Sequence, residues 1–269
     1  MLLTLKERGT ADFCMLIKTI QWNIGGGKIR KAGDNPESGP YTNDGLAYIE
    51  GVLKKLRVDI VTLQETHADE KTVQAEILAS NVGLPHVVND IYDLSHIEDG
   101  QGLGQAILSR FAICAHSFNF FFNPRLRMQG PDGSTWISHN KGVSKCLLAA
   151  EDNKTIQIAT LHLLPFRKYG VDPFEKEFEN LRKNIADLAS PSEKMFLLQG
   201  DFNFDDASIK RFLPTLFSNN ISEVLQDKPT TPRGRRYDHI IYKGITHVRS
   251  EVITNVLTDH FPVYSEFEL

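Results

Sequence analysis

The sequence predicts a layered α/β protein, and two patterns along the chain carry this prediction. In the first 80 residues, short apolar runs typical of buried strands alternate with segments of helical periodicity. The residues that follow are richer in strand patterns and contain two further helical segments. Strands that alternate with helices are typical of folds in which helices pack on the faces of a sheet.

The first part of the chain reads, in order, as a strand at 16–22, a helix at 45–56, a strand at 59–64 and a helix at 70–80. The first strand runs into a loop with three consecutive glycines at 25–27. Apolar side chains recur at helical spacing in both helices, and Asn43 or Asp44 is placed to cap the first. The second strand ends at Glu65, so its apolar run stops at a carboxylate.

The rest of the chain predicts strands at 85–91, 105–109, 113–121, 143–150, 155–161, 195–198, 237–242, 245–252 and 261–267. Helices are predicted at 173–189 and 206–217. Long polar loops occupy 93–104 and 123–141, and loops of that length inside a compact domain are more often functional than idle. No linker or internal repeat divides the chain. We therefore expect one domain over 15–269, preceded by a tail at 1–14.

The composition is that of a globular protein with no strong bias toward one partner. The chain has 269 residues, a net charge of -4 and three cysteines without CxxC spacing. This charge gives no overall attraction to polyanions, although local basic patches can still bind nucleic acid. Sparse, unpaired cysteines predict neither a disulfide framework nor a zinc site and fit a reducing cytoplasm. No apolar stretch approaches the length of about 18 residues that a membrane span needs, and a monomer is expected.

Polar side chains end most of the predicted strands, and this is the main functional signal. The motif Gly200-Asp201-Phe202-Asn203 follows a buried strand, and in extended chain residues i and i+2 point the same way. Other strands end or begin at Asn23, Glu65, His162, Asp238 and the pair Asp259-His260. Each residue alone has a structural explanation, such as a turn or a core histidine. Together they predict one site at a sheet edge.

The chemistry of this set is consistent with phosphate-ester hydrolysis. The oxygens of Glu65, Asp201 and Asp259, with the amides of Asn23 and Asn203, are hard ligands suited to Mg²⁺ or Mn²⁺. The imidazoles of His162 and His260 can donate to phosphate oxygens, and Asp238 could hold His260 in one tautomer. A hard metal, phosphate-facing donors and a carboxylate that activates water together describe metal-assisted hydrolysis.

Six short motifs occur in a characteristic order: Trp-Asn-Ile at 22–24, Leu-Gln-Glu at 63–65, Leu-His-Leu at 161–163, Gly-Asp-Phe-Asn at 200–203, Tyr-Asp-His-Ile at 237–240 and Asp-His-Phe-Pro-Val at 259–263. This ordered set resembles the endonuclease/exonuclease/phosphatase superfamily of DNase I-like enzymes. The resemblance implies a four-layer α/β sandwich, with two central mixed β-sheets flanked by helices and the site at one sheet edge.

The resemblance also implies a role for each matching residue. Glu65 would be the main metal ligand, with Asn23 beside it and Asp259 completing the metal end. Asp201 would orient or deprotonate the attacking water, and Asn203 would hold a phosphate oxygen. His162 would contact the phosphate or leaving group, and His260, paired with Asp238, would stabilise charge at phosphorus. Many relatives have an acidic residue where this chain has Gly25, so the metal would depend more on Glu65.

Basic residues in loops near the predicted site favour a phosphate-rich substrate. Those assigned to substrate binding are Lys28, Arg167, Arg233, Arg235 and Arg236, although solvated loop charge is the alternative explanation. The leading prediction is a phosphodiesterase or nuclease. A sphingomyelinase-like or inositol-phosphatase-like enzyme, or an inactive binding module of the same fold, is the alternative. The aromatic run at 118–122 could contact lipid, but a buried or edge strand is the preferred interpretation.

Overall fold

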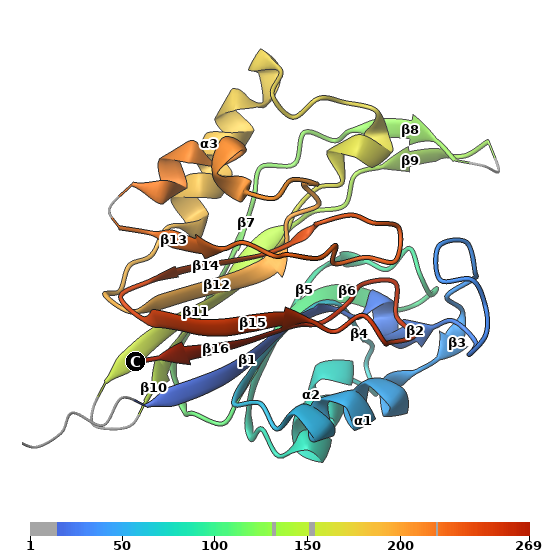
Figure 1. Ribbon diagram of the computed structural model, residues 1–269. Coiled ribbons are helices and arrows are strands. Elements are labelled where there is room, and N and C mark those ends of the chain that lie inside the picture. The colour runs from blue at the N-terminus through green and yellow to red at the C-terminus, as the bar shows by residue number, and fades with distance from the viewer. Residues whose placement is uncertain (1–14, 131–132, 151–153, 219) are drawn as a thin grey trace, which may run out of the picture.

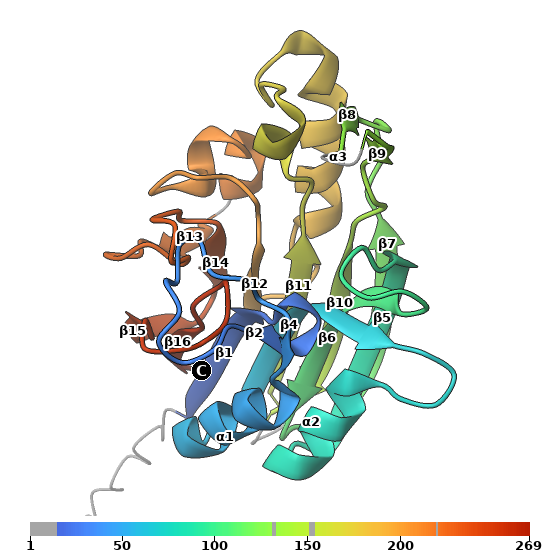
Figure 2. The same cartoon turned by 90° about the vertical axis from the view of Figure 1, so that its right-hand side faces the viewer.

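The computed structural model describes residues 15–130, 133–150, 154–218 and 220–269. The tail predicted at 1–14 lies outside the described residues. Two six-stranded mixed sheets pack face to face and helices cover their outer faces (Figures 1 and 2). The predicted four-layer α/β sandwich is therefore confirmed.

The first sheet joins the two ends of the described chain. Its strands in spatial order are β15 (Thr246–Val252), β16 (Val263–Glu268), β1 (Leu16–Asn23), β4 (Ile60–Ala68), β6 (Gly102–Ser109) and β5 (His86–Leu94). The pair β1 and β4 is parallel and the other pairs are antiparallel. Helices α1 (Leu46–Leu56) and α2 (Gln74–Val82) cover its outer face (Figure 1).

The second sheet is built from the later part of the chain. Its strands in spatial order are β13 (Ser222–Val224), β14 (Asp238–Lys243), β12 (Phe196–Asp201), β11 (Thr155–His162), β10 (Gly142–Ala149) and β7 (Ile113–Phe120). The pair β11 and β12 is parallel, so both strands end at the same edge. Helix α3 (Glu179–Ala189) packs on the outer face through Leu181 and Ile185 (Figure 1).

Strict alternation along β1 brings its polar residues between the two sheets. Ile20 and Trp22 face α1 and α2 in one apolar core. Thr19, Gln21 and Asn23 point the other way and accept from or donate to residues of the second sheet. Because successive strand side chains alternate between faces, a strand with an apolar outer face presents its remaining residues, here polar, to the neighbouring sheet.

The space between the sheets is apolar at one end and polar toward the other. Ile17, Ile158, Leu197 and Phe267 belong to the apolar part. The polar part contains four buried glutamines, Gln21, Gln64, Gln105 and Gln199. The side-chain amides of the first three donate to residues of the second sheet, and the amide of Gln199 donates to a residue of the first. We call these four residues the glutamine layer. Each amide hydrogen bond in it joins one sheet to the other.

The structure differs from the predicted elements mainly in the helices. Residues 206–217 form two 3₁₀ turns, Ile209–Arg211 and Pro214–Phe217, and not one helix. Pro214 interrupts the segment because it has no amide hydrogen to donate within a helix. The helix predicted at 173–189 is α-helical only from Glu179 onward, after a 3₁₀ turn at Lys176–Phe178.

Two short ribbons in loop segments were not predicted. One pairs β2 (Lys28–Ile29) with β3 (Asn43–Asp44), and the other pairs β8 (Arg127–Gln129) with β9 (Thr135–Ile137). In Figure 2 the β8–β9 ribbon lies beyond the end of β7, at the same end of the molecule as α3. The aromatic run at 118–122 belongs partly to β7, which is an edge strand as preferred above.

Candidate active site

One cleft collects the polar strand ends that the sequence singles out. Its volume is about 690 Å³, and the predicted residues that line it are Asn23, Glu65, His162, Asp201, Asn203, Asp259 and His260. Asp238 lies behind them and is fully buried. The first sheet contributes Asn23 and Glu65, and the second contributes His162 and Asp201. The site therefore spans both sheets.

Asp201 is held at the centre of this cleft by two hydrogen bonds. The Asn23 side-chain amide donates to Oδ2 at 3.0 Å, and the Asn203 backbone amide donates to Oδ1 at 2.8 Å. Asn203 has a φ of 49°, a conformation that asparagine tolerates better than most residues, and its side chain donates to the Leu163 carbonyl. Burial raises the pKa of Asp201 to about 7, although the positive charge of His260 opposes this shift.

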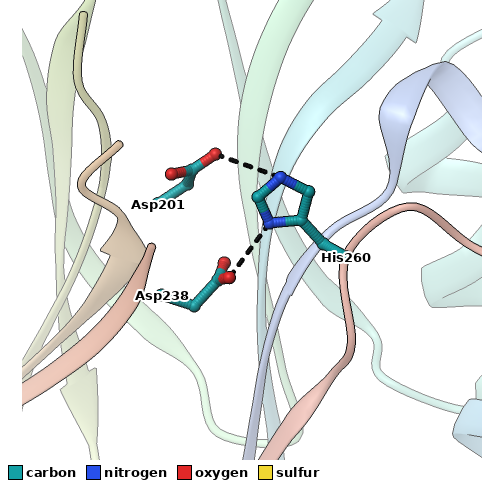
Figure 3. A group of neighbouring side chains, drawn as sticks. All are labelled: Asp201, Asp238 and His260. Carbon is teal, nitrogen blue, oxygen red and sulfur yellow. Dashed lines mark hydrogen bonds and ion pairs between the residues drawn. The ribbon is translucent and has the colours of Figure 1, made fainter. Parts of the chain in front are cut away.

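His260 lies between two carboxylates (Figure 3). Its Nδ1 is 2.9 Å from Asp238 Oδ2 and its Nε2 is 3.7 Å from Asp201 Oδ2. Burial alone would lower the pKa of His260, but attraction by Asp238 and Asp201 raises it well above its ordinary value. Gln21 of the glutamine layer donates to the other oxygen of Asp238. The two carboxylates therefore favour the protonated form of His260, which is fixed from behind by a carboxylate that is itself hydrogen-bonded.

His162 has very different neighbours, which the sequence did not single out. The Tyr92 hydroxyl is 3.0 Å from its Nδ1, and the Lys141 ammonium is 2.8 Å from the same nitrogen. All three side chains are buried. Burial, with a further effect of Lys141, holds the pKa of His162 well below its ordinary value. Lys141 lies in a long polar loop directly before β10, and that position was its only signal in the sequence.

Glu65 and Asp259 form the carboxylate side of the cleft. A β-bulge between Gln64 and Thr66 gives Glu65 a φ of 55° and interrupts the alternation of β4. Burial raises the pKa of Glu65, opposed by Lys141 and reinforced by Asp259. Within the described part of the chain, Asp259 Oδ1 is buried without a hydrogen-bond partner. Two such carboxylates suit a hard divalent cation, which would compensate their burial.

Gly25 leaves the space beside it to the carboxylate of Asp259, which belongs to the last of the six motifs. A Cβ atom at position 25 would lie 3.0 Å from Asp259 Oδ1, and the φ of 51° already disfavours larger residues. The space that a side chain at 25 would need is therefore taken by Asp259. Asn23 Oδ1 accepts from the Gly25 amide, which orients the carboxamide beside the cleft.

A second group of possible metal ligands lies nearby but fits a cation less well. One ligand atom each of Asp201, Asp238 and His260 lies within 4.8 Å of the others. Because Asp238 and Asp201 favour the protonated form of His260, and its Nδ1 is already bonded to Asp238, the ring is a poor ligand for a metal ion. The carboxylates of Glu65 and Asp259, with Asn23 beside them, are the better donor set for Mg²⁺ or Mn²⁺.

The five basic residues assigned to substrate binding lie in different places. Arg233 lines the cleft. Lys28 is paired with Glu98 at 2.6 Å, and Arg235 is paired with Asp205 at 2.7 Å. The side chain of Asp205 also accepts from the Arg236 backbone and lies 3.8 Å from Arg167, which borders a neighbouring hollow. Most of these cations therefore lie beside carboxylates outside the cleft. The sequence did not predict these ion pairs.

The two long loops supply the outer wall of the cleft. The loop after β5 contributes His96 and Ile97, and the β9 end of the other loop contributes Trp136 and Ile137. The Lys168 ammonium lies 4.9 Å from the centre of the Trp136 ring, a cation–π contact at the mouth of the cleft. The expectation that these loops are functional is consistent with this placement, although the particular residues were not predicted.

A fully buried histidine next to the site gives a pH prediction for stability. His239 donates through Nε2 to the Phe204 carbonyl, and burial lowers its pKa. The unfolded chain therefore takes up a proton below about pH 6.5 that the folded chain resists, so stability is full above that pH and falls as pH drops. We expect urea unfolding of His239→Gln to depend less on pH between 7 and 5 than wild type, by up to about 1.4 kcal/mol per pH unit. Parallel curves for the two proteins would contradict this assignment.

The fold is a DNase I-like α/β sandwich, and one cleft between its two sheets collects carboxylate, carboxamide and imidazole side chains. The chain belongs to the endonuclease/exonuclease/phosphatase family, whose model matches residues 20–260. Members of this family generally hydrolyse phosphoester bonds. The structure described here contains no helix that is both long and apolar enough to cross a membrane.

Individual relatives are distant in sequence. A UPF0294 protein of Yersinia enterocolitica is 26% identical over 121 residues, which are 44% of this chain and 44% of that protein. The chain thus spans less than half the length of this curated relative. An endonuclease/exonuclease/phosphatase structure from Beutenbergia cavernae has a TM-score of 0.72 at 15% identity, covering 94% of this chain and 72% of that one. The human nocturnin catalytic domain has a TM-score of 0.61 at 15% identity, covering 97% and 99%.

Proposed function

We propose that this protein is a divalent-metal-dependent phosphodiesterase, with nucleic acid as the leading substrate class. The observation that carries the proposal is the position of Asp201. Its carboxylate is held by Asn23 and Asn203, faces His260 and shares one cleft with the half-buried carboxylates Glu65 and Asp259. In this proposal a base, a fixed positive charge and a metal-binding group surround one cleft.

In this proposal Asp201 accepts a proton from the water that attacks phosphorus. A base with a pKa near the working pH is effective in this role, and burial raises the pKa of Asp201 to about 7. The hydrogen bonds from Asn23 and Asn203 fix the direction of its oxygens. Asp201 therefore enters the reaction already oriented, without a rotation that would cost entropy.

His260 stabilises the negative charge that develops on the phosphate oxygens. Its cationic form is maintained by Asp238, which is fully buried and is held by Gln21. A positive charge that is fixed before the reaction costs no reorganisation in the transition state. Glu65 and Asp259, with Asn23, would hold a divalent ion that polarises a phosphate oxygen when bound.

The cations at the cleft support a polyanionic substrate despite the negative charge of the chain. Lys141, Lys168 and Arg233 line the cleft. Positive charge gathered in a cleft raises the local concentration of anions independently of net charge. The Trp136 ring at the mouth offers a face on which a planar group such as a nucleobase can stack. These features favour a nucleic acid over an inositol phosphate.

Metal dependence is the direct test of this function. We expect hydrolysis of bis-p-nitrophenyl phosphate with Mg²⁺ or Mn²⁺, loss of at least about 100-fold in EDTA, and recovery when the metal is added back. Circular dichroism in EDTA is the control for unfolding. A rate unchanged by EDTA would contradict the proposal. A panel of plasmid DNA, RNA, sphingomyelin and phosphoinositides then tests the substrate, and cleavage of lipid without nucleic acid would exclude the nuclease assignment.

A further inference from the structure

The outer wall of the cleft includes polar side chains that belong to none of the six motifs. His96 lies in the loop after β5, His139 in the loop between β9 and β10, and Lys168 in a 3₁₀ turn, Phe166–Tyr169. We call these three residues the outer cluster. Three separate segments bring them to one cleft, and none of them takes part in the chemical steps proposed above. Residues that loops bring to a cleft are candidates for contact with the substrate.

The two imidazoles of the outer cluster lie in contact with each other. The ring centres of His96 and His139 are 5.0 Å apart, and the ring planes are inclined by 40°. Asp93 Oδ2 is 3.6 Å from His139 Nδ1 and accepts a hydrogen bond from the Asn140 backbone amide at 2.7 Å. Among the residues that the structure describes, neither imidazole forms a hydrogen bond. Their ring nitrogens can therefore bind a group that enters the cleft.

Lys168 gives the outer cluster a positive charge that no carboxylate neutralises. Its ammonium lies 4.9 Å from the centre of the Trp136 ring, a contact that holds it at the mouth of the cleft. Within the described part of the chain, Lys168 forms no ion pair. Lys28 and Arg235, by contrast, are paired with carboxylates at 2.6 and 2.7 Å. An unpaired cation beside two imidazoles is suited to bind an anion.

The outer cluster lies within electrostatic range of the reacting groups. Burial lowers the pKa of His139, and the charges of Lys141 and Lys168 act in the same direction. Burial raises the pKa of Glu65, and Lys168 is among the cations that oppose this shift. The cleft that contains all of these groups has a volume of about 690 Å³, which is enough for a ligand larger than a single phosphate. A substrate cut beside Asp201 can therefore place a second group at the outer cluster.

We propose that Lys168, His96 and His139 form a second anion subsite, which binds a terminal phosphate one nucleoside away from the ester that is cut. Lys168 supplies the charge, and the imidazole N–H groups donate hydrogen bonds to the phosphate oxygens. The effect of this subsite on turnover rests on the proposed phosphodiesterase function, whereas its binding of the anion does not.

A terminal phosphate matches the outer cluster better than a carboxylate does. The three terminal oxygens of a phosphate can accept from three separate donors, whereas a carboxylate has two oxygens. The charge of Asp93 opposes the effect of burial and favours protonation of His139, and a bound phosphate would act in the same direction. A protonated imidazole donates from both of its nitrogens. Anion binding thus strengthens the donors that hold the anion.

A pair of nucleotide esters tests this subsite. Both are p-nitrophenyl esters of thymidine 5′-phosphate, one with a terminal 3′-phosphate and one with a free 3′-hydroxyl. Because the scissile ester and the leaving group are the same, the ratio of their kcat/KM values isolates the second phosphate. We expect a preference of about 10- to 100-fold for the 3′-phosphorylated ester in wild type, the range for hydrogen bonds to a charged group. The isomeric pair, with the ester at the 3′-phosphate and the terminal phosphate at 5′, covers the opposite chain direction.

Variants of the outer cluster assign this preference to its residues. Lys168→Met should remove most of the preference and Lys168→Arg should keep most of it, because arginine retains the charge. His96→Gln and His139→Gln should each lower it by about 2- to 10-fold, as for loss of one hydrogen bond. Added salt should lower it in wild type. Lys176→Met, a change in another 3₁₀ turn, is the matched control and should leave the preference unchanged. Equal rates on the two esters of both wild-type pairs, or a preference that survives in Lys168→Met, would overturn the proposal.

Calorimetry separates the subsite from the proposed function. If wild type hydrolyses none of these esters, the proposed function fails, and binding of thymidine 3′,5′-bisphosphate in EDTA decides the subsite. Wild type should bind the bisphosphate at least about 10-fold more tightly than either thymidine monophosphate, and Lys168→Met should lose most of this difference. Equal affinities for the bisphosphate and the monophosphates in wild type would overturn the subsite.

Discussion

Asp201→Asn is expected to lower kcat/KM for bis-p-nitrophenyl phosphate by about 10³- to 10⁴-fold, the upper part of the range for removal of a general base. Asparagine has nearly the same shape as aspartate but cannot accept the proton of the attacking water. The two donors that hold Asp201, Asn23 and the Asn203 amide, remain in place. The loss should therefore fall on kcat, with little change in KM.

Stability separates this catalytic loss from misfolding. The substitution removes one acceptor oxygen, which costs about 1 kcal/mol, but it also removes a buried charge whose burial is unfavourable. Asp201→Asn should therefore unfold within about 1–2 kcal/mol of wild type in urea. Asp205→Asn, a change at an aspartate that lies outside the cleft and pairs with Arg235, is the matched control. Asp201→Asn activity within tenfold of wild type would exclude Asp201 as the base.

His260→Gln is expected to lower kcat by about 10²- to 10³-fold, as for loss of one preorganised donor in a transition state. Glutamine can still donate a hydrogen bond but carries no charge, so the missing contribution is the cation. The change also leaves the buried Asp238 carboxylate without its charged partner, although Gln21 still donates a hydrogen bond to it. A drop in stability of about 3 kcal/mol is therefore expected beside the kinetic effect.

The double variant His260→Gln/Asp238→Asn tells these two effects apart. Removing both charges should restore much of the stability, because no unpaired buried carboxylate remains. It should not restore kcat, because the cation is still absent. His86→Gln, on β5 away from the cleft, is the control for a histidine substitution. Recovery of kcat in the double variant would mean that the charge of His260 has no catalytic role.

The sequence predicts the strand-end residues well because their positions depend on local alternation. In β1 and β12, the apolar outer face fixes which residues point between the sheets, so Asn23 and Asp201 follow from a period of two. The prediction that these two strands lie close together depended on the motif resemblance. The four-layer arrangement likewise came from the ordered motifs, because strand patterns alone do not show which strands share a sheet.

Residues whose position depends on the packing of distant elements were not predicted. Lys141 lies 49 residues from Tyr92 in sequence, and both reach His162 only because β5 and β10 lie at the same side of the two packed sheets. The pairings of Lys28 with Glu98 and of Arg235 with Asp205 also join segments with no local pattern in common. Loop cations therefore could not be divided into free and paired groups from the sequence.

The glutamine layer has a consequence for how precisely the cleft can be assembled. Asn23 and Glu65 come from one sheet and His162 and Asp201 from the other, so the distances between them depend on how the sheets are placed relative to each other. Apolar contacts are non-directional and would tolerate a small slide of one sheet over the other. Hydrogen bonds from Gln21 and Gln199 have preferred lengths and angles and would not. The buried amides thus fix the position of one sheet relative to the other. They lie next to the cleft residues whose separations depend on that position.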